Sequence, residues 1–410
     1  MITKLVSKNF EIKDSFKIDV ALENGRYSCL DALFKKKPQE IIDIVAESGL
    51  RGKGGGGALA GGKWQLASDH KGIKYLVVNA DESEPGTFKD RRILSLDPHL
   101  LIEGIIATCY AIGSHNSYIY VRGEYEEFSD VLQDAIDEAY EKKYLGNGAK
   151  YPMEVVVHRG AGAYICGEKS ALLESLEGNR GHPRLKPHKP SPEFYFGEPT
   201  LVNNVETIAS VPYIVENGSD AYRQYGTEKS PGTLLFAISG NVNRPGVYEV
   251  AFGTPMLDYI NELGGGVKNG KKLKAVIPGG ASTPVLPASI IKDVKLDYEN
   301  LKDMGSALGT GGMIVMDEDV SMVKALKNLL RFYHHESCGQ CTPCREGTAW
   351  SDKILDKFIS KEATKKDLEI LRSVSQSMNG KTICVFAPAA SGVIDGFLEH
   401  FEHEFLECIR

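Results

Sequence analysis

A run of three cysteines places the strongest restriction on how this 410-residue chain can fold. Cys338, Cys341 and Cys344 follow one another in the segment ESCGQCTPC, with two residues between successive thiols. This spacing lets sulfurs from one loop converge on one point, and a fourth thiolate completes the ligand set of a cubane iron–sulfur cluster. Cys384, in KTICVFAP, is the best fourth ligand. Two loops far apart in the sequence must therefore meet in space.

Zinc is the competing interpretation of the four cysteines, because four thiolates also form structural zinc sites. Zinc sites more often show two separated C-x-x-C pairs than a triple run, so the spacing favours the iron–sulfur cluster. In a cytosolic chain, clustered cysteines indicate metal or redox chemistry more often than disulfides. We expect the scattered cysteines to be free buried thiols: Cys29, Cys109, Cys166 and Cys408.

The last quarter of the chain has the periodicity of helices. Apolar residues recur three and four positions apart at 323–333, 350–358 and 368–374, and a further helical pattern covers 392–409. Four amphipathic helices predict a bundle. The cysteine run falls in the turn between the first two helices, and Cys384 falls between the last two.

The first half of the chain alternates β-rich and helical patterns. Strand patterns at 75–78, 117–121 and 153–157 are separated by helical patterns at 97–113 and 128–142. This alternation predicts a largely parallel sheet with helices on its faces.

A second β-containing region begins at GTLLFAISGNVNRPGVYEV, where an NRPG turn joins two β runs as in a hairpin. The chain therefore divides into three expected units. An α/β domain with an N-terminal extension covers 1–230, a small α+β module covers 231–305, and the helical bundle covers 306–410.

The segment RGKGGGGALAGGKW, at 51–64, is half glycine. Glycine exposes backbone N–H groups that can cradle an anion, and the missing Cβ lets a planar ring approach the chain. The segment is not a nucleoside-triphosphate loop, because no Ser or Thr follows Lys63. A flexible linker is disfavoured because Lys63 and Trp64 follow at once. We therefore expect a phosphate or an aromatic ring system against this backbone.

A polar turn, NADESEPGTFKDR, follows the first strand pattern and offers Asn79, Asp81, Glu82 and Glu84. Ligands of open α/β sheets bind at the carboxyl ends of the strands. The segment GAGAYICGE repeats this design after the third strand pattern, and VNNVET adds two amides and a hydroxyl. These groups suit hydrogen bonds to a ribityl chain or a carboxamide.

Composition excludes several classes of protein. The net charge of −7 argues against nucleic acid as the main partner. No apolar run reaches the roughly 18 residues of a membrane span. The N-terminal segment MITKLVSKNF lacks an apolar core with a cleavage site, so we expect a cytoplasmic chain without direct membrane contact.

With these motifs in view, the chain resembles the flavoprotein (F) subunits of respiratory complex I, the 51 kDa family of NADH:quinone oxidoreductase. The resemblance runs from about residue 40 to the last helix and rests on four motifs in order: NADESEPGTFKDR, GAGAYICGE, LVNNVET and ESCGQCTPCREG. Many hydrogenase diaphorase subunits carry extra iron–sulfur modules that this chain lacks, which favours the complex I form.

The resemblance implies a Rossmann-like FMN domain, a ubiquitin-like (soluble-ligand-binding β-grasp) module and a helical bundle with a 4Fe–4S cluster. A hydride passes from NADH to FMN, and single electrons leave through the cluster on Cys338, Cys341, Cys344 and Cys384. Lys63 would face the FMN phosphate. The positions that match FMN contacts of the family are Gly52, Gly54, Gly55, Lys63, Asn79, Asp81, Glu82, Tyr164, Gly167, Glu168, Val202, Asn203, Asn204 and Thr207.

The nucleotide pocket departs from the family pattern. Family members carry aromatic residues that stack on adenine where this chain has Ala58, Leu66 and Lys189. Stacking is worth roughly 1–3 kcal/mol per base, so their loss weakens nucleotide binding. Lys169 stands where the family has a second glutamate that disfavours a ribose 2′-phosphate.

Two nucleotide-pocket residues keep the family type. Glu84 is expected near the nicotinamide, as the catalytic residue, and Lys186 near the nucleotide phosphates.

Three donors remain open at this point. The donor is NADH by resemblance, NADPH if Lys169 and Lys189 bind the extra phosphate, or reduced ferredoxin or flavodoxin docking at a basic opening. The implied partners are a thioredoxin-like 2Fe–2S subunit and a large multi-cluster iron–sulfur subunit. The chain would lie in the peripheral arm of a membrane-bound complex. The alternative assembly is a soluble hydrogenase or formate dehydrogenase, with this chain as its diaphorase subunit.

Overall fold

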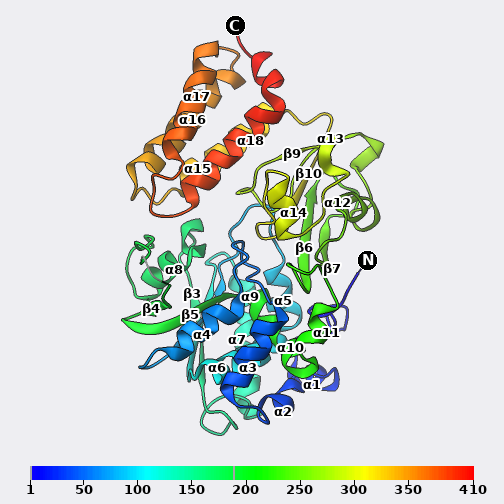
Figure 1. The fold of residues 1–410 in the computed structure, drawn as a ribbon, viewed down its shortest axis with the longest axis vertical. Helices are drawn as coiled ribbons and strands as arrows, with labels where there is room; N and C mark the ends of the chain where they lie inside the picture. Colours follow the sequence, from blue (N-terminus) through cyan, green and yellow to red (C-terminus); the bar gives the residue numbers. More distant parts are fainter. Residues whose placement is uncertain (1, 188–189) are drawn as a thin grey trace.

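A computed structural model describes residues 2–187 and 190–410. In these residues the chain forms two five-stranded sheets and a helical bundle. Figure 1 shows the first sheet and its helices at one end, the bundle at the other, and the second sheet beside the junction. The α/β class with a second module and a C-terminal bundle is confirmed.

The first sheet has the order β3-β2-β1-β5-β4. The strands β1 (Tyr75–Ala80), β2 (Asn116–Val121), β3 (Glu154–Arg159) and β5 (Glu198–Asn204) are parallel, and the short edge strand β4 (Glu193–Tyr195) is antiparallel. The prediction of a largely parallel sheet is therefore correct.

Both faces of this sheet are covered. Along β1, Leu76, Val78 and Ala80 point into one core, whereas Val77 points into another. All four side chains are fully buried, as expected for a parallel strand packed on two sides.

The first core is built around α6 (Pro98–Ile112), which is buried on almost every side. Pro98 begins α6, and Gly113, in the left-handed conformation, ends it. Within the described residues no single helix has the length and apolar composition of a membrane span; α5 (Asp90–Leu96) and α6, bent by 103°, reach them only as a pair. The other helices of this domain are α1 (Ile18–Glu23), α2 (Cys29–Leu33), α3 (Pro38–Ser48), α4 (Ala60–Asp69), α7 (Glu126–Glu141), η1 (Tyr164–Gly167), α8 (Lys169–Leu176), α9 (Val205–Ala209), α10 (Val211–Asn217) and α11 (Ser219–Arg223).

The second sheet has the order β7-β6-β10-β8-β9. The hairpin predicted at NRPG joins β6 (Thr233–Gly240) to β7 (Gly246–Ala251). The strand β10 (Gly312–Asp317) lies beside β6 and β8 (Leu273–Ile277), so this domain extends past the boundary predicted at 305. The remaining elements are β9 (Leu286–Pro287), α12 (Met256–Asp258), η2 (Tyr259–Leu263), η3 (Lys268–Gly270), α13 (Ala288–Ile291) and α14 (Tyr298–Asp303).

The bundle consists of α15 (Met322–Glu336), α16 (Thr342–Ile359), α17 (Lys365–Met378) and α18 (Phe386–Leu406), as predicted. Thr364 and Asp367 form a capping box at the start of α17. The core of the bundle continues through α8 to the outer face of the first sheet, so the bundle is fixed against the first domain.

Candidate functional site

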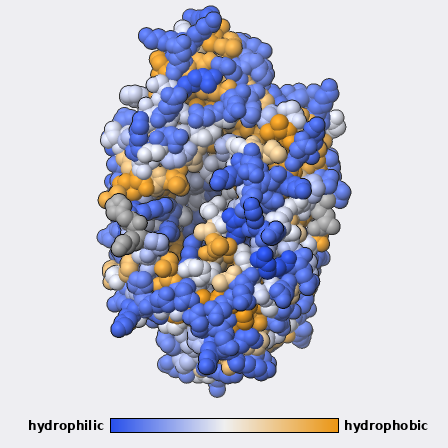
Figure 2. All heavy atoms as spheres, in the orientation of Figure 1, coloured by the Kyte–Doolittle hydropathy of each residue, from blue (hydrophilic) through white to orange (hydrophobic). Residues whose placement is uncertain are grey.

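A cavity of about 450 Å³ lies where the two domains and the bundle meet. This volume is within the range of pockets that bind organic ligands and cofactors. The face in Figure 2 is mainly hydrophilic and is hollowed between the bundle above and the first domain below. The walls are formed by Lys53, Gly54, Gly55, Gly56, Asn79, Asp81, Glu82, Ser83, Glu84, Thr87, Lys89, Asp90, Tyr164, Ile165, Gly167, Glu168, Asn204, Ser282, Thr283, Ala307, Gly309, Thr310, Cys384, Val385, Phe386, Pro388 and Ala389.

Most of the residues matched to FMN contacts lie in this wall. They are Gly54, Gly55, Asn79, Asp81, Glu82, Tyr164, Gly167, Glu168 and Asn204. Gly52 begins the glycine loop (residues 52–57), and Thr207 supports this loop through Oγ1, which accepts a hydrogen bond of 2.9 Å from the backbone N–H of Lys53. Asn203 is buried on β5, beside Asn204.

The glycine loop closes on itself. The N–H of Gly52 donates to the carbonyl of Ala58 over 2.8 Å, and Nε of Arg51 donates to the carbonyl of Gly57 over 2.7 Å. A Cβ atom on Gly54 would lie 3.0 Å from Cβ of Asn204. The loop therefore needs glycine for its own packing as well as for open space at the cavity.

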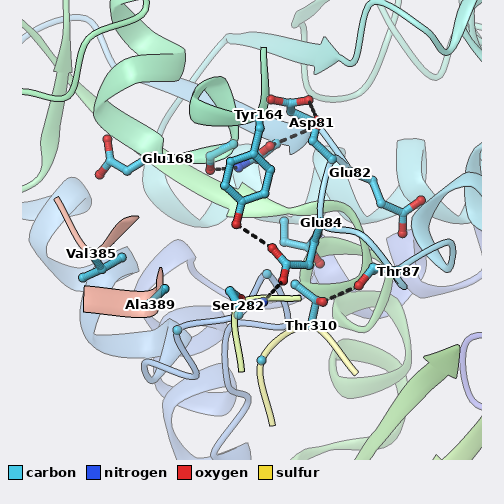
Figure 3. Close-up of a pocket in the computed structure, with 18 of the residues that line it drawn as sticks. Asp81, Glu82, Glu84, Thr87, Tyr164, Glu168, Ser282, Thr310, Val385 and Ala389 are labelled. Carbon is cyan, nitrogen blue, oxygen red and sulfur yellow. Dashed lines mark hydrogen bonds between the residues drawn. The ribbon is translucent and has the colours of Figure 1, made fainter. Parts of the chain in front are cut away.

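Glu84 lies inside the cavity and receives two hydrogen bonds (Figure 3). The hydroxyl of Tyr164 donates to Oε2 over 2.5 Å, and the N–H of Ser282 donates to Oε1 over 2.6 Å. Burial raises the pKa of Glu84, and these hydrogen bonds oppose that shift. Glu84 is thus held rigidly by residues of both domains.

Asp81 keeps one carboxylate oxygen for a ligand. Ser83 donates to Oδ1 over 2.6 Å, while the buried Oδ2 has no partner in the described part of the chain. Burial raises the pKa of Asp81 to about 7. The buried amide nitrogen of Asn203 likewise has no partner there. Of these two residues, Asp81 lies in the cavity wall, and its unpaired buried oxygen fits a polar cofactor with hydroxyl groups.

Glu82 has a different task. Its Oε1 accepts the N–H groups of Lys89 and Asp90, each over 2.7 Å, and Oε2 accepts the hydroxyl of Tyr125 over 2.8 Å. These bonds place Glu82 at the N-terminus of α5, where a carboxylate is favoured. Both carboxylate oxygens of Glu82 already accept hydrogen bonds from the protein. The side chain therefore fixes the end of the polar turn and has little remaining capacity to accept a hydrogen bond from a ligand.

A buried network of charges forms the floor of the cavity. Lys89 contacts Asp90 over 2.8 Å and Glu206 over 2.7 Å, and Lys53 contacts Glu206 over 3.2 Å. Glu206 also accepts the N–H of Leu235, on β6, over 2.9 Å. Burial raises the pKa of Glu206, but the two lysines outweigh it and lower the pKa overall.

Sequence reasoning missed several wall residues. Lys89 and Asp90 lie near the end of the motif NADESEPGTFKDR, so the motif itself carried the signal for them. Ser282 and Thr310 come from loops of the second domain and carry no motif. Thr310 contacts Thr87 through their hydroxyls over 2.5 Å, which ties the two domains together at the cavity.

The four predicted cluster ligands come together. Cys341 precedes α16, Cys344 lies in its first turn, and Cys384 precedes α18. The N–H of Ile383 donates to Sγ of Cys341 over 3.4 Å, which joins the two loops. Burial raises the pKa of Cys344 to about 11, and the other three thiols contribute to that shift. The charges of the other three thiols thus reach Cys344, and Cys384 is also part of the cavity wall.

The donor set bears on the choice of metal. It consists of four cysteine thiols, three of them in a C-x-x-C-x-x-C run, which fits the ligands of an iron–sulfur cluster.

A smaller hollow lies beside the glycine loop and contains part of the predicted nucleotide pocket. Its walls include Lys63, Leu66, Lys169, Glu193 and Val202. Lys169 forms an ion pair with Glu193. Burial, and then the nearby Lys169, lower the pKa of Lys63. Lys63 thus borders this hollow rather than the main cavity.

The other predicted nucleotide residues are less enclosed. Ala58 and Lys186 are exposed, and Lys189 lies outside the described residues.

Three family models match the chain. Residues 45–213 match the Nuo51 FMN-binding domain, residues 234–315 the SLBB domain, and residues 324–408 the NADH-ubiquinone oxidoreductase-F iron–sulfur binding region. The match at 234–315 extends into β10, in agreement with the second sheet.

Curated relatives match along almost the whole chain. The F subunit of NADH-quinone oxidoreductase from Rickettsia typhi is 46% identical over 403 residues, covering 97% of this chain and 96% of the relative. The second F subunit of NADH-quinone oxidoreductase from Rhizobium meliloti is 44% identical and covers 100% and 98%.

Solved structures of an NAD+-reducing [NiFe]-hydrogenase are also similar. The H2-reduced form matches with a TM-score of 0.85 at 35% identity, covering 92% of this chain and 65% of the other. The air-oxidized form matches with a TM-score of 0.86 at 33% identity, covering 100% and 67%. The chain therefore spans about two thirds of the hydrogenase chain that it matches.

Proposed function

Since the chain belongs to the family of NADH-quinone oxidoreductase F subunits, we propose that the cavity at the junction of its three parts is the seat of its FMN. The protein is the electron-input flavoprotein of such an oxidoreductase, with FMN and a 4Fe–4S cluster as its cofactors. The observation that carries the placement is that Cys384 lies in the same cavity wall as Glu84 and the glycine loop.

The cavity offers a suitable group for each part of a flavin nucleotide. Gly54, Gly55 and Gly56 expose backbone to a planar ring or a phosphate. The unpaired Oδ2 of Asp81 suits a ribityl hydroxyl. Asn203 is buried on β5 next to the wall residue Asn204, and we assign its unpaired amide to a carbonyl of the ring system. The roles of these residues follow from the groups they leave unpaired.

When bound, FMN takes up a pair of electrons as a hydride and gives them up singly. The protein must exclude water around that exchange and keep the cluster close by. Val385, Phe386 and Ala389 form an apolar part of the wall directly after Cys384. We assign the cluster to Cys338, Cys341, Cys344 and Cys384.

For the donor we favour NADH over NADPH. Binding of the extra phosphate of NADPH needs the positive charge of Lys169, but the ion pair with Glu193 neutralises that charge. Glu84 stands in the cavity, where it can accept a hydrogen bond from the carboxamide of a nicotinamide. Lys186 is exposed and can approach the phosphates of a nucleotide.

The partners are other subunits of a complex, as for the relatives. We propose a thioredoxin-like 2Fe–2S subunit and a large multi-cluster subunit, in a peripheral arm on the cytoplasmic side of the membrane. The similarity to the hydrogenase fits a soluble diaphorase as the alternative, but the match to the NADH-quinone oxidoreductase relatives covers nearly the full length of both proteins.

The test is anaerobic mixing of the FMN-loaded chain with NADH, NADPH or reduced ferredoxin in turn, with flavin absorbance as readout. We expect NADH to bleach the flavin faster than NADPH does at the same concentration. If only reduced ferredoxin bleaches the flavin, ferredoxin and not NADH is the electron donor. A chain that does not retain FMN would overturn the proposal.

A further inference from the structure

Tyr298, the first residue of α14 in the second domain, contacts the glycine loop from outside the cavity. Its hydroxyl donates to the carbonyl of Gly52 over 3.0 Å. Its ring lies against Gly57, where a Cβ atom would come within 2.5 Å of the ring carbon Cε1. Gly57 also has a φ of +60°. Tyr298 thus contacts the loop near both ends and lies outside the cavity wall.

Arg51 holds the same ring from the loop side. Its guanidinium lies 4.0 Å from the centroid of the Tyr298 ring, a cation–π contact. Its Nε donates to the carbonyl of Gly57 over 2.7 Å, and its Nη1 pairs with Glu299. Glu299 is fixed in turn by Ser230, whose hydroxyl donates to it over 2.6 Å.

Tyr298 and Arg51 leave the cavity side of the loop uncovered. Gly54, Gly55 and Gly56 face the cavity, whereas Gly52 and Gly57 face Tyr298. Ordering a glycine-rich segment costs more conformational entropy than ordering other residues. Contacts that order the loop before a ligand arrives lower the cost of binding.

We propose that Tyr298 and Arg51 form a positioning lock through which the second domain sets the affinity of the glycine loop for flavin. The proposal rests on the proposed function for the identity of the ligand. Through this lock the second domain would contribute to FMN binding without contacting FMN at Tyr298. Tyr298 is a positioning residue, since it acts through the loop backbone.

The test compares two tyrosines of the second domain. Tyr259 is fully buried, and its hydroxyl donates to the carbonyl of Phe236 over 2.8 Å, away from the loop. Tyr298→Phe and Tyr259→Phe each remove one hydroxyl that donates to a backbone carbonyl. Tyr298→Leu also removes the ring that contacts Arg51 and Gly57.

The readouts are the dissociation constant of FMN from the full apoprotein, by quenching of flavin fluorescence, and hydrogen exchange at residues 52–57. We expect Tyr298→Phe to weaken FMN binding about fivefold, the worth of one net hydrogen bond. Tyr298→Leu weakens it by at least about tenfold, since packing and cation–π contacts are lost as well. Loop amides exchange faster in both variants, and Tyr259→Phe leaves both readouts at the wild-type value.

Binding by Tyr298→Leu within about twofold of wild type would overturn the lock, as would an equal loss in Tyr259→Phe. If Tyr298→Leu does not fold, the FMN affinities of Tyr298→Phe and Tyr259→Phe are compared instead. Equal affinities of these two variants would overturn the lock. A wild-type chain that fails to bind FMN would instead remove the proposed function, and the lock with it.

Discussion

Tyr164 donates a 2.5 Å hydrogen bond to Glu84 inside the cavity, and the backbone of Ser282 binds the second oxygen of the same carboxylate. Hydrogen bonds to the charged form lower the pKa of a carboxyl, whereas its burial raises it. Burial and hydrogen bonding therefore act in opposite directions on the pKa of Glu84, and residues of both domains supply the hydrogen bonds.

Removing the Tyr164 hydroxyl should shift the ionisation of Glu84 upward. In Tyr164→Phe we expect the acid limb of kcat/KM for NADH to move to higher pH by about 0.7, the equivalent of one hydrogen bond of about 1 kcal/mol. The pH profile of NADH oxidation measures this, with Tyr259→Phe as the control. A shift to lower pH would show that Glu84 does not control the acid limb.

Asp81 should make the apoprotein less stable at neutral than at acidic pH. The pKa of Asp81 in the folded protein is about 7, above the ordinary value of 3.8. Below pH 3.8 the group is protonated in both states and does not lower the free energy of unfolding. As pH rises from 3.8 toward 7 the unfolded state ionises first, so the free energy of unfolding falls. Since a pKa difference of one is worth about 1.4 kcal/mol, the loss is at most about 4 kcal/mol.

Asp81→Asn removes this dependence. The unfolding temperature of the variant, relative to wild type, should rise between about pH 4.5 and pH 7 and stay level above that range. Thermal unfolding of both apoproteins across this range measures the difference. A constant difference would mean that Asp81 is not desolvated.

Glu206 should be needed for the stability of the cavity floor. Glu206→Gln leaves Lys53 and Lys89 buried with less negative charge, and breaking a buried ion pair costs about 3–5 kcal/mol. We expect a clear fall in unfolding temperature at neutral pH. Glu262→Gln, at an exposed carboxylate of the second domain, should change it little. Equal effects of the two substitutions would refute this role.

Glu193 should restrain the use of NADPH by neutralising Lys169. In Glu193→Gln we expect the ratio of kcat/KM for NADPH over NADH to rise about fivefold, the equivalent of about 1 kcal/mol. The double variant Glu193→Gln with Lys169→Ala should return to the wild-type ratio, because the lysine that would bind the extra phosphate is gone. Steady-state rates with both nucleotides give the answer, and an unchanged ratio in the single variant would exclude Lys169 from the donor site.

Much of the fold followed from local patterns. The strand and helix periodicities predicted the parallel sheet, the hairpin at NRPG and the four bundle helices, although α16 begins at Thr342, well before its apolar pattern at 350–358. Cys384 was expected as the fourth ligand from its place between the last two helices, and the hydrogen bond from the N–H of Ile383 to Sγ of Cys341 joins its loop to the cysteine run. The boundary at 305 failed because β10 is one short apolar run, and its sheet partners β6 and β8 are distant in sequence.

The cavity was only partly predictable, because its second wall has no local signature. Ser282, Thr310 and Tyr298 are ordinary loop or helix residues until the second domain packs on the first. The charge of Lys169 had a clear meaning in the sequence, but its partner Glu193 lies on an edge strand that the sequence did not predict. Pairing across the fold, and not residue type, decides what these side chains do.

The most direct test of electron transfer from NADH through FMN to the cluster is anaerobic reduction by NADH of the wild-type chain and of Cys384→Ala. Absorbance follows the flavin, and electron paramagnetic resonance follows the reduced cluster. We expect the flavin to bleach in both proteins and only the wild type to show the signal of a reduced 4Fe–4S cluster. A wild-type chain in which NADH bleaches the flavin but never reduces a cluster would contradict this electron transfer.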